Sequence, residues 1–339
     1  MGTLLKRHRW IAPVALLAPG ILWLLVFYLY PAIQMLQSSF WSGSLEKGFT
    51  FSLDNYTNYT KALETYAPMY GRSIMYAGAA TVLTFLIAYP LAYTIAFRGG
   101  RFKNLLLFLV VAPFFTSFLL RTISWQILLA DDSPILRAIH LLPFVSTDFR
   151  LLQTPIAVIS GITYAFLPFM TLPVYVAVEK IDYRLVEAAR DLYAGPWRPG
   201  GAIVGFIVGG GLATVLGVAF EWDFLLTGIA GAVTGAAIGW FFISESFVRV
   251  TFPLSVPGVF AGSLLTFIPA IGDYVNAELL GNPDTTMIGN VIQNKFLTQN
   301  DYPAASALSF MLMAGVLVVV AIYARILGTE ELSASAGRV

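Results

Sequence analysis

The sequence predicts an all-α polytopic membrane protein, that is, a chain that crosses the bilayer several times as helices. Of its 339 residues, 58% are hydrophobic and only 12% are charged. Soluble domains carry about a quarter charged residues, so this composition indicates a lipid environment. A bilayer core of about 30 Å needs about 20 consecutive apolar residues in a helix, and several runs of the chain reach that length.

Six apolar runs are long enough to cross the membrane once each. They lie at 11–32, 74–97, 105–130, 154–177, 254–275 and 304–326. Two further runs, at 200–220 and 224–243, lie between the fourth and the fifth, so we expect eight crossings. Pro90 and Pro113 are compatible with spans, because neighbouring helices can satisfy the freed backbone groups.

The N-terminal run is expected to be an uncleaved first helix. It follows a basic stretch, as in a signal peptide, but it extends to Tyr30 and is longer than the roughly 7–15 residues of a signal core. Lys and Arg then give the orientation, because they gather in cytoplasmic loops. They occur before the first span, after the second and after the fourth, which predicts both termini in the cytoplasm. These basic residues are Lys6, Arg7, Arg9, Arg98, Arg101, Lys103, Lys180, Arg184, Arg190 and Arg198.

Sequence motifs for catalysis or for metal binding are missing. The chain has no cysteine, which excludes disulfides and thiolate metal sites, and its two histidines, His8 and His140, lack neighbours at ligand spacing. No G-x-x-x-x-G-K-[ST] loop occurs, so the chain does not bind ATP by that route. We expect no catalytic residue, no metal and no cofactor in this chain.

A short amphipathic helix is predicted after the fourth span, from Ile181 to Leu192. Asp182 can cap its start. Leu185, Ala189 and Leu192 then fall on one face, opposite Arg184, Glu187 and Asp191. Periodicity alone is equally compatible with an interfacial linker.

Residues Glu187-Ala188-Ala189-Arg190-Asp191-Leu192 resemble the start of the EAA motif of binding-protein-dependent ABC importer permeases. The second half of the motif is similar to the stretch from Phe247 to Gly258, which includes Pro253. If 199–245 are excised, the spacing of the family's motif is restored. The stretches 89–93 and 268–307 are also similar, the latter most to the first permease of spermidine/putrescine-type systems.

This resemblance implies a type I ABC importer transmembrane domain with six core helices, in the bacterial cytoplasmic (inner) membrane. The subunit would pair with a second permease, and an extracytoplasmic binding protein or lipoprotein would deliver the substrate. The EAA loop would dock on a cytoplasmic ABC ATPase dimer, which would bind the ATP and Mg. The ATPase-coupling positions that the resemblance implies are Glu187, Ala188, Ala189, Arg190, Asp191, Leu192, Phe247 and Pro253.

Residues 199–245 are expected to form an inserted, Gly-rich transmembrane hairpin. The permease domain would then comprise 1–198 and 246–339, with a split EAA loop at 182–198 and 246–257. Gly231, Gly235 and Gly239 form a small-xxx-small ridge, which permits close packing of helices, and Glu221-Trp222-Asp223 would be the outer tip. Alternatively, the glycines only soften a hairpin that faces lipid.

Two carboxylates, Asp273 and Glu278, are candidates for the substrate path together with Tyr274. A carboxylate at membrane depth is a functional candidate by default, and it could bind a cationic amine with help from aromatic faces. Five residues rotate a helix by about 140°, so both acids do not easily line one path, and we favour Asp273. It could equally contact the binding protein or water.

The function expected is that of a permease subunit, with a polyamine such as spermidine or putrescine as the substrate that the resemblance implies. Permeases of phosphonate, thiamine and iron importers are similar. The alternative is a gradient-driven secondary transporter or channel subunit. Such proteins tend to contain inverted repeats, and the sequence shows no such internal symmetry.

Overall fold

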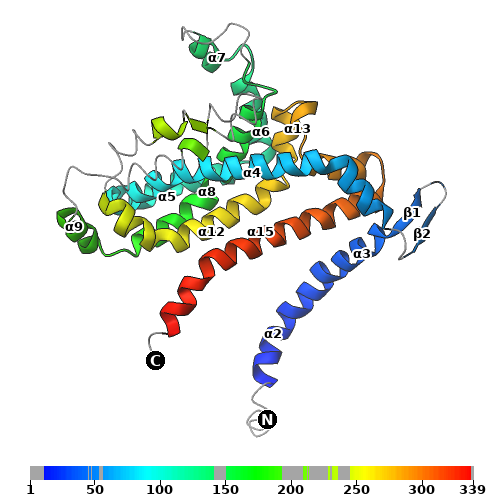
Figure 1. The fold of residues 1–339 in the computed structure, drawn as a ribbon, viewed down its shortest axis with the longest axis horizontal. Coiled ribbons are helices and arrows are strands. Elements are labelled where there is room, and N and C mark those ends of the chain that lie inside the picture. Colours follow the sequence, from blue (N-terminus) through cyan, green and yellow to red (C-terminus); the bar gives the residue numbers. More distant parts are fainter. Residues whose placement is uncertain are drawn as a thin grey trace. The chain divides into compact units, whose positions relative to one another are not determined.

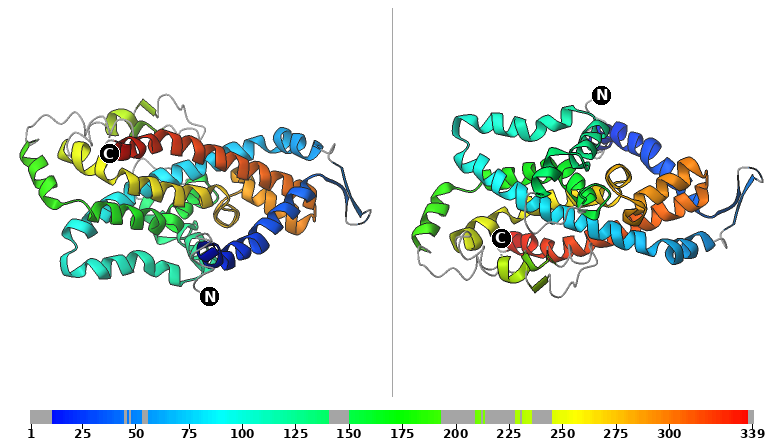
Figure 2. Two further views of the ribbon diagram at one scale, coloured as in Figure 1. Left: turned by 90° about the horizontal axis from the view of Figure 1, so that it is seen from below. Right: turned by 90° about the horizontal axis from the view of Figure 1, so that it is seen from above.

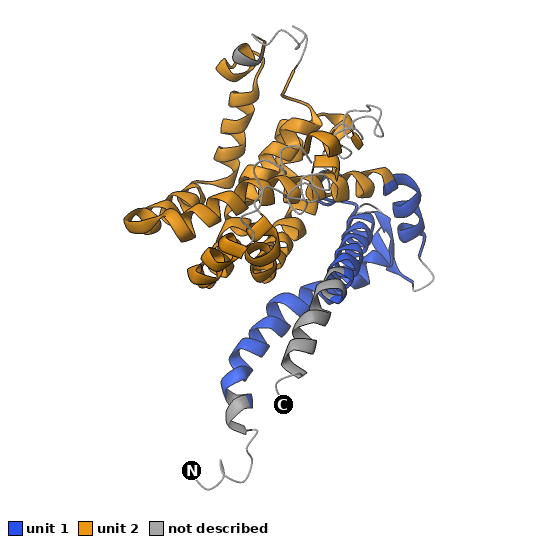
Figure 3. Cartoon of the chain, turned by 60° about the vertical axis from the view of Figure 1, so that its left-hand side comes forward, with its two compact units in different colours: residues 1–67, 291–339 blue, residues 68–290 orange. Residues whose placement is uncertain are grey.

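The computed structural model describes residues 11–44, 46, 48–52, 56–140, 150–192, 209–211, 213, 228–229, 231–235 and 245–336. The chain divides into two compact units (Figure 3). Unit 1 comprises residues 1–67 and 291–339, and unit 2 comprises residues 68–290.

Unit 1 contains the first apolar run and the last. The first run forms α2 (Ile11–Leu24), the π-helical turn η1 (Leu25–Leu29) and α3 (Tyr30–Ser39), and the last forms α15 (Tyr302–Ala336) after the π-helical turn η6 (Asn294–Thr298). Helices α3 and α15 pack together, and the hydroxyls of Ser38 and Ser306 lie 2.7 Å apart. Unit 1 therefore brings together the first and the last apolar runs of the chain.

A short β-hairpin follows α3. Strand β1 (Trp41–Ser44) pairs antiparallel with β2 (Gly48–Phe51), with Trp41 opposite Phe51 and Ser44 opposite Gly48. Gly43 has φ +125° and would collide with the carbonyl oxygen of Gly48 if it carried a Cβ, so this position requires glycine. Figure 1 shows the hairpin between α3 and α4 (Thr57–Arg98), which begins in unit 1 and continues into unit 2.

Unit 2 contains the middle of the chain. After α4, a 3-10 turn η2 (Gly100–Phe102) leads into the following helices. These are α5 (Lys103–Val111), η3 (Ala112–Phe115), α6 (Phe118–Leu129), α7 (Pro134–His140), α8 (Pro155–Glu179), α9 (Tyr183–Leu192), the π-helical turn η4 (Phe247–Thr251), α12 (Phe252–Ile271), α13 (Val275–Leu280), η5 (Pro283–Thr285) and α14 (Ile288–Gln293), which ends just beyond the unit.

Helices α8 and α12 share an extensive interface in unit 2, and they run side by side in Figures 1 and 2. Gly258 and Gly262 of α12 lie against α8, where an added Cβ would approach the carbonyl oxygen of Pro173 to 2.6 Å and the Sδ of Met170 to 2.8 Å. Glycine thus allows the two backbones to approach closely, as is common between helices in membranes.

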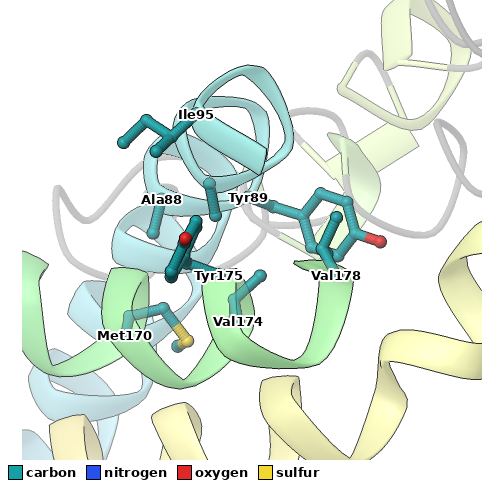
Figure 4. Packing of buried hydrophobic residues seen from close by; sticks show 8 residues of the cluster. Ala88, Tyr89, Ile95, Met170, Val174, Tyr175 and Val178 are labelled. Carbon is teal, nitrogen blue, oxygen red and sulfur yellow. The ribbon is translucent and has the colours of Figure 1, made fainter. Parts of the chain in front are cut away.

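Helix α4 packs against α8 through a buried apolar cluster (Figure 4). Small alanines of α4 lie among larger side chains, which lets α8 approach it closely. The buried members are Ala88, Tyr89, Ala92 and Ile95 of α4, and Met170, Val174, Tyr175 and Val178 of α8.

Five helices among the described residues are long and apolar enough to cross a membrane, and five of the six predicted runs overlap them. They are Leu16–Ser39, Thr57–Arg98, Pro155–Glu179, Phe247–Ile271 and Tyr302–Ile322. The all-α polytopic fold is thereby confirmed, with only the β-hairpin added in the part of the chain that the structure describes.

The predicted run 105–130 differs, because it is not one straight helix. Gly100–Phe115 and Phe118–Arg137 meet at an angle of 94°. Thr116 and Ser117 between them are extended, with ψ values of 152° and 136°, and Pro113 withholds a backbone donor from the turn before the break. Two extended residues are enough to redirect a helix, which an apolar run does not reveal.

Most of the predicted hairpin at 199–245 lies outside the described residues, as do its Glu-Trp-Asp tip and Gly239. Of the described pieces, Gly209 lies so close to Gly231 that a Cβ on either residue would collide with the carbonyl oxygen of the other. The two predicted runs therefore approach each other at glycine, and the transmembrane hairpin itself stays a prediction. His8 and the basic residues before the first span also lie outside the described part.

Candidate coupling site and substrate path

Helix α9 begins where the sequence places its cap. The backbone N–H of Arg184 donates to Oδ1 of Asp182 at 3.0 Å, which satisfies one of the free donors at the helix start. The helix spans Tyr183–Leu192 and so contains the start of the EAA-like motif, Glu187–Leu192; residues 193–198 of the first half lie outside the described residues.

The buried face of α9 differs from the predicted one. Val186 and Ala189 are buried, whereas Leu185 and Leu192 are 53% and 79% exposed. The prediction was therefore wrong for both leucines. A spacing of three residues puts Val186 and Ala189 on one stripe, and the packing partners of α9, which the sequence pattern does not contain, select that stripe.

The implied ATPase-coupling positions divide between this buried face and the surface. Ala189 packs inward, whereas Glu187, Ala188, Asp191 and Leu192 are exposed. A carboxylate, a small side chain and an apolar side chain are thus accessible together on one short helix. Their role in docking stays a prediction.

The second half of the split motif lies beside the first. Helix α9 contacts η4, although residues 193–246 separate them in the sequence. Phe247 of η4 is half-buried, with its ring 5.3 Å from that of Tyr89 in an edge-on contact. Pro253 is exposed in the first turn of α12.

An apolar groove of about 850 Å³ adjoins this site. It lies between α8, the start of α9 and α12, and exposed Leu185 is on its border. Its other lining residues include Val176, Ala177, Ile181, Leu254 and Pro257.

A second group of contacts, which sequence reasoning missed, connects α9 to α4. The guanidinium of Arg190 donates to the hydroxyl of Tyr93 at 3.2 Å and to that of Tyr183 at 3.3 Å. The ring of Tyr183 also lies 5.3 Å from that of Phe97. The signal that could have found them is the aromatic residue at every fourth position of α4, namely Phe85, Tyr89, Tyr93 and Phe97.

The preferred substrate-path acid, Asp273, is only 7% exposed. Its carboxylate accepts hydrogen bonds from the backbone N–H of Asn276 at 3.1 Å and from the Asn276 side chain at 2.6 Å. The side-chain oxygen Oδ1 of Asn276 in turn accepts a hydrogen bond from the hydroxyl of Thr122 of α6 at 3.2 Å. This geometry makes Asp273 a cap for α13 and part of a buried polar network.

Tyr274 and Glu278, by contrast, are exposed. Glu278 accepts a hydrogen bond from the side chain of Asn290 at 2.8 Å through Oε2, and its Oε1 has no hydrogen-bond partner among the described residues. Asp273 lies in the break between α12 and α13, whereas Glu278 is on α13, so the two acids do not share one helix; Asp273 is buried and Glu278 is exposed. The geometry therefore favours Glu278 over Asp273 as the acid that meets a solute, and the substrate-path role of all three residues stays a prediction.

Comparison with known proteins places these features in a family. The family "Binding-protein-dependent transport system inner membrane component" matches residues 244–327. The spermidine/putrescine transport system permease protein PotB of Haemophilus influenzae is 33% identical over 305 residues, covering 89% of this chain and 90% of the relative. PotB of Escherichia coli is 30% identical over 303 residues, covering 88% and 92%.

A solved structure shares the fold. The crystal structure of a bacterial ABC transporter involved in the import of the acidic polysaccharide alginate aligns with a TM-score of 0.59 at 16% identity, covering 96% of both chains. The spans and the similarity to transport permeases thus define a membrane-embedded transport subunit. The chain belongs to the family of binding-protein-dependent ABC importer permeases, which are integral proteins of the inner membrane.

Proposed function

We propose that this permease subunit forms the translocation path for a polyamine, spermidine or putrescine. The observation that carries the proposal is the 33% identity to a spermidine/putrescine permease across 89% of the chain. The exposed pair of Tyr274 and Glu278 supports it, since a carboxylate beside an aromatic face suits an alkyl ammonium group.

ATP hydrolysis in this proposal takes place on a partner, and the chain itself is not catalytic. A cytoplasmic ABC ATPase dimer binds the ATP and Mg and docks on the exposed surface of α9 and on Pro253. A movement of α9 reaches the membrane directly, because α9 contacts η4, η4 continues into α12, and α12 packs along α8. This arrangement requires α9 and both termini on the cytoplasmic side.

The remaining partners follow from the same scheme. A second permease completes the path, and an extracytoplasmic binding protein or lipoprotein delivers the polyamine to the opposite side. The family description supports a binding protein as a partner.

The test is uptake of radiolabelled spermidine by proteoliposomes that contain this chain with its second permease, its ATPase and its binding protein. We expect uptake to require ATP and to be competed by putrescine but not by thiamine. Uptake by this chain alone, driven by an ion gradient and abolished by an ionophore, would instead support the secondary-transporter alternative.

Glu187→Ala tests the docking surface in the same assay. Truncating a central interface side chain costs about 1–2 kcal/mol or more, which corresponds to a loss of roughly tenfold in ATPase affinity. We expect co-purification of the ATPase and spermidine uptake to fall together. Glu64→Ala, which removes an exposed acid from the start of α4, is the matched control, and equal behaviour of both variants would refute docking at α9.

A further inference from the structure

The two halves of the split motif have no short covalent connection. In sequence, α9 ends at Leu192 and η4 begins at Phe247. Residues 193–246 separate the two halves in sequence, but α9 contacts η4 directly, so movement of α9 can reach η4 through non-covalent contacts. The question is which contacts hold α9 in place.

Helix α4 contacts both halves through one row of aromatic side chains, which we call the α4 aromatic row: Phe85, Tyr89, Tyr93 and Phe97. Their spacing of four residues puts them along one side of the helix. Neighbouring rings in the row touch, with centroids 5.5 Å apart for Phe85 and Tyr89 and 4.9 Å for Tyr93 and Phe97. The row is therefore continuous apart from the single step between Tyr89 and Tyr93.

Phe247 of η4 covers that step. Its ring lies 5.3 Å from that of Tyr89 and 6.4 Å from that of Tyr93. The row also reaches α12, because the hydroxyls of Tyr89 and Ser255 lie 2.6 Å apart and the rings of Phe85 and Phe252 lie 6.3 Å apart. Its first three members thus hold the second half of the motif.

Tyr93 and Phe97 hold the first half. Arg190 bonds Tyr93 and Tyr183 at the same time, and Tyr183 also contacts Phe97. Only arginine can do this well, because its planar fork presents several donors in fixed directions, whereas lysine offers one compact charge. Tyr93 touches both halves, through Arg190 on one side and Phe247 on the other.

We propose that Tyr93 is a positioning residue that couples α9 to η4, with Arg190 as its partner on α9. Resting on the proposed function, this assigns the transmission of ATP-driven movement to the α4 aromatic row. The hydroxyl of Tyr93 holds α9 against α4 through Arg190, while its ring holds α4 against η4 through Phe247. Transmission through Tyr93 needs no chain continuity between the two halves.

The experiment uses the complete complex in proteoliposomes and measures the spermidine taken up per ATP hydrolysed. Tyr93→Phe removes one hydroxyl and retains the ring. Since a hydrogen bond contributes modestly to a local equilibrium, we expect this ratio to fall roughly two- to tenfold. KM for spermidine and the amount of assembled complex should stay at the wild-type level. Tyr56→Phe, which removes an exposed hydroxyl just before α4, is the control and should leave the ratio unchanged.

Arg190→Lys identifies the partner. It should lower the ratio as Tyr93→Phe does, and the double variant should be no worse than either single one, because residues that act through one contact are not additive. A wild-type ratio in Tyr93→Phe, losses that multiply in the double variant, or a loss of assembled complex in proportion to uptake would each overturn the proposal. In all three cases the wild-type complex would still show ATP-dependent uptake, so the proposed function would stand.

Discussion

At the scale of single residues, Asp273 and Glu278 show how two acids five positions apart can differ. Asp273 is enclosed and accepts two hydrogen bonds from Asn276, whereas Glu278 is exposed and bonded to Asn290. An enclosed carboxylate that caps a helix serves the fold, and an exposed one near an aromatic ring can bind a solute.

We therefore expect Asp273→Ala and Glu278→Gln to have different effects. Asp273→Ala leaves the Asn276 donors unpaired and should cost about 1–3 kcal/mol of stability, visible as a lower Tm of the purified protein. Glu278→Gln retains an acceptor for Asn290 and should keep Tm, while it raises KM for spermidine because the charge is lost. An unchanged Tm with a raised KM in Asp273→Ala would reverse these assignments.

At the scale of elements, the contact between α8 and α12 depends on two glycines. A Cβ at Gly258 would lie 2.6 Å from the carbonyl oxygen of Pro173, and this atom belongs to the backbone and cannot rotate away. Gly78 of α4 has nothing within 4 Å of an added Cβ, although both glycines lie within long apolar helices.

Gly258→Ala should consequently destabilise the protein, whereas Gly78→Ala should not. Overpacking at a backbone contact costs about 1–3 kcal/mol, and Gly→Ala in an open helical position is neutral or favourable. Thermal unfolding in detergent, followed by circular dichroism, measures both variants. Equal Tm values for the two would show that α8 and α12 are not in close contact.

The bend between α5 and α6 is also a property of elements. Length and hydropathy located the apolar run correctly but gave no sign that Thr116 and Ser117 are extended. Both residues are compatible with a helix in sequence. Proline alone does not predict a bend either, since Pro90 lies within the continuous helix α4. The bend depends on what α6 packs against, and α6 contacts α13 and α8.

At the scale of the whole molecule, the predicted insertion at 199–245 can be tested against the α4 aromatic row. The row holds α9 and η4 from one side, and direct contact holds them to each other. Removal of 199–245, which joins Arg198 to Ser246, should therefore leave a folded permease that still takes up spermidine.

We also expect the effects of the deletion and of Tyr93→Phe on the coupling ratio not to be additive. Once a short chain segment links α9 to η4, the covalent connection can carry part of the movement, so the loss caused by Tyr93→Phe should be smaller than in the full-length chain. The coupling ratio of the four proteins measures this in a double-mutant cycle. A deletion that abolishes assembly would instead assign 199–245 to contact with another subunit.

The sequence by itself determined the class of protein, the location of five apolar spans and the start of α9 at Asp182. These depend on length, composition and local spacing, because a helix in lipid must satisfy its own backbone and show apolar side chains along its length. Only the tertiary structure decided that Val186 rather than Leu185 is buried, that Asp273 is enclosed, that 105–130 is bent, and that Tyr93 connects both halves of the motif. Each of these depends on which helices become neighbours, and in a chain that is apolar almost throughout, the sequence pattern does not specify which side of a helix faces protein and which faces lipid.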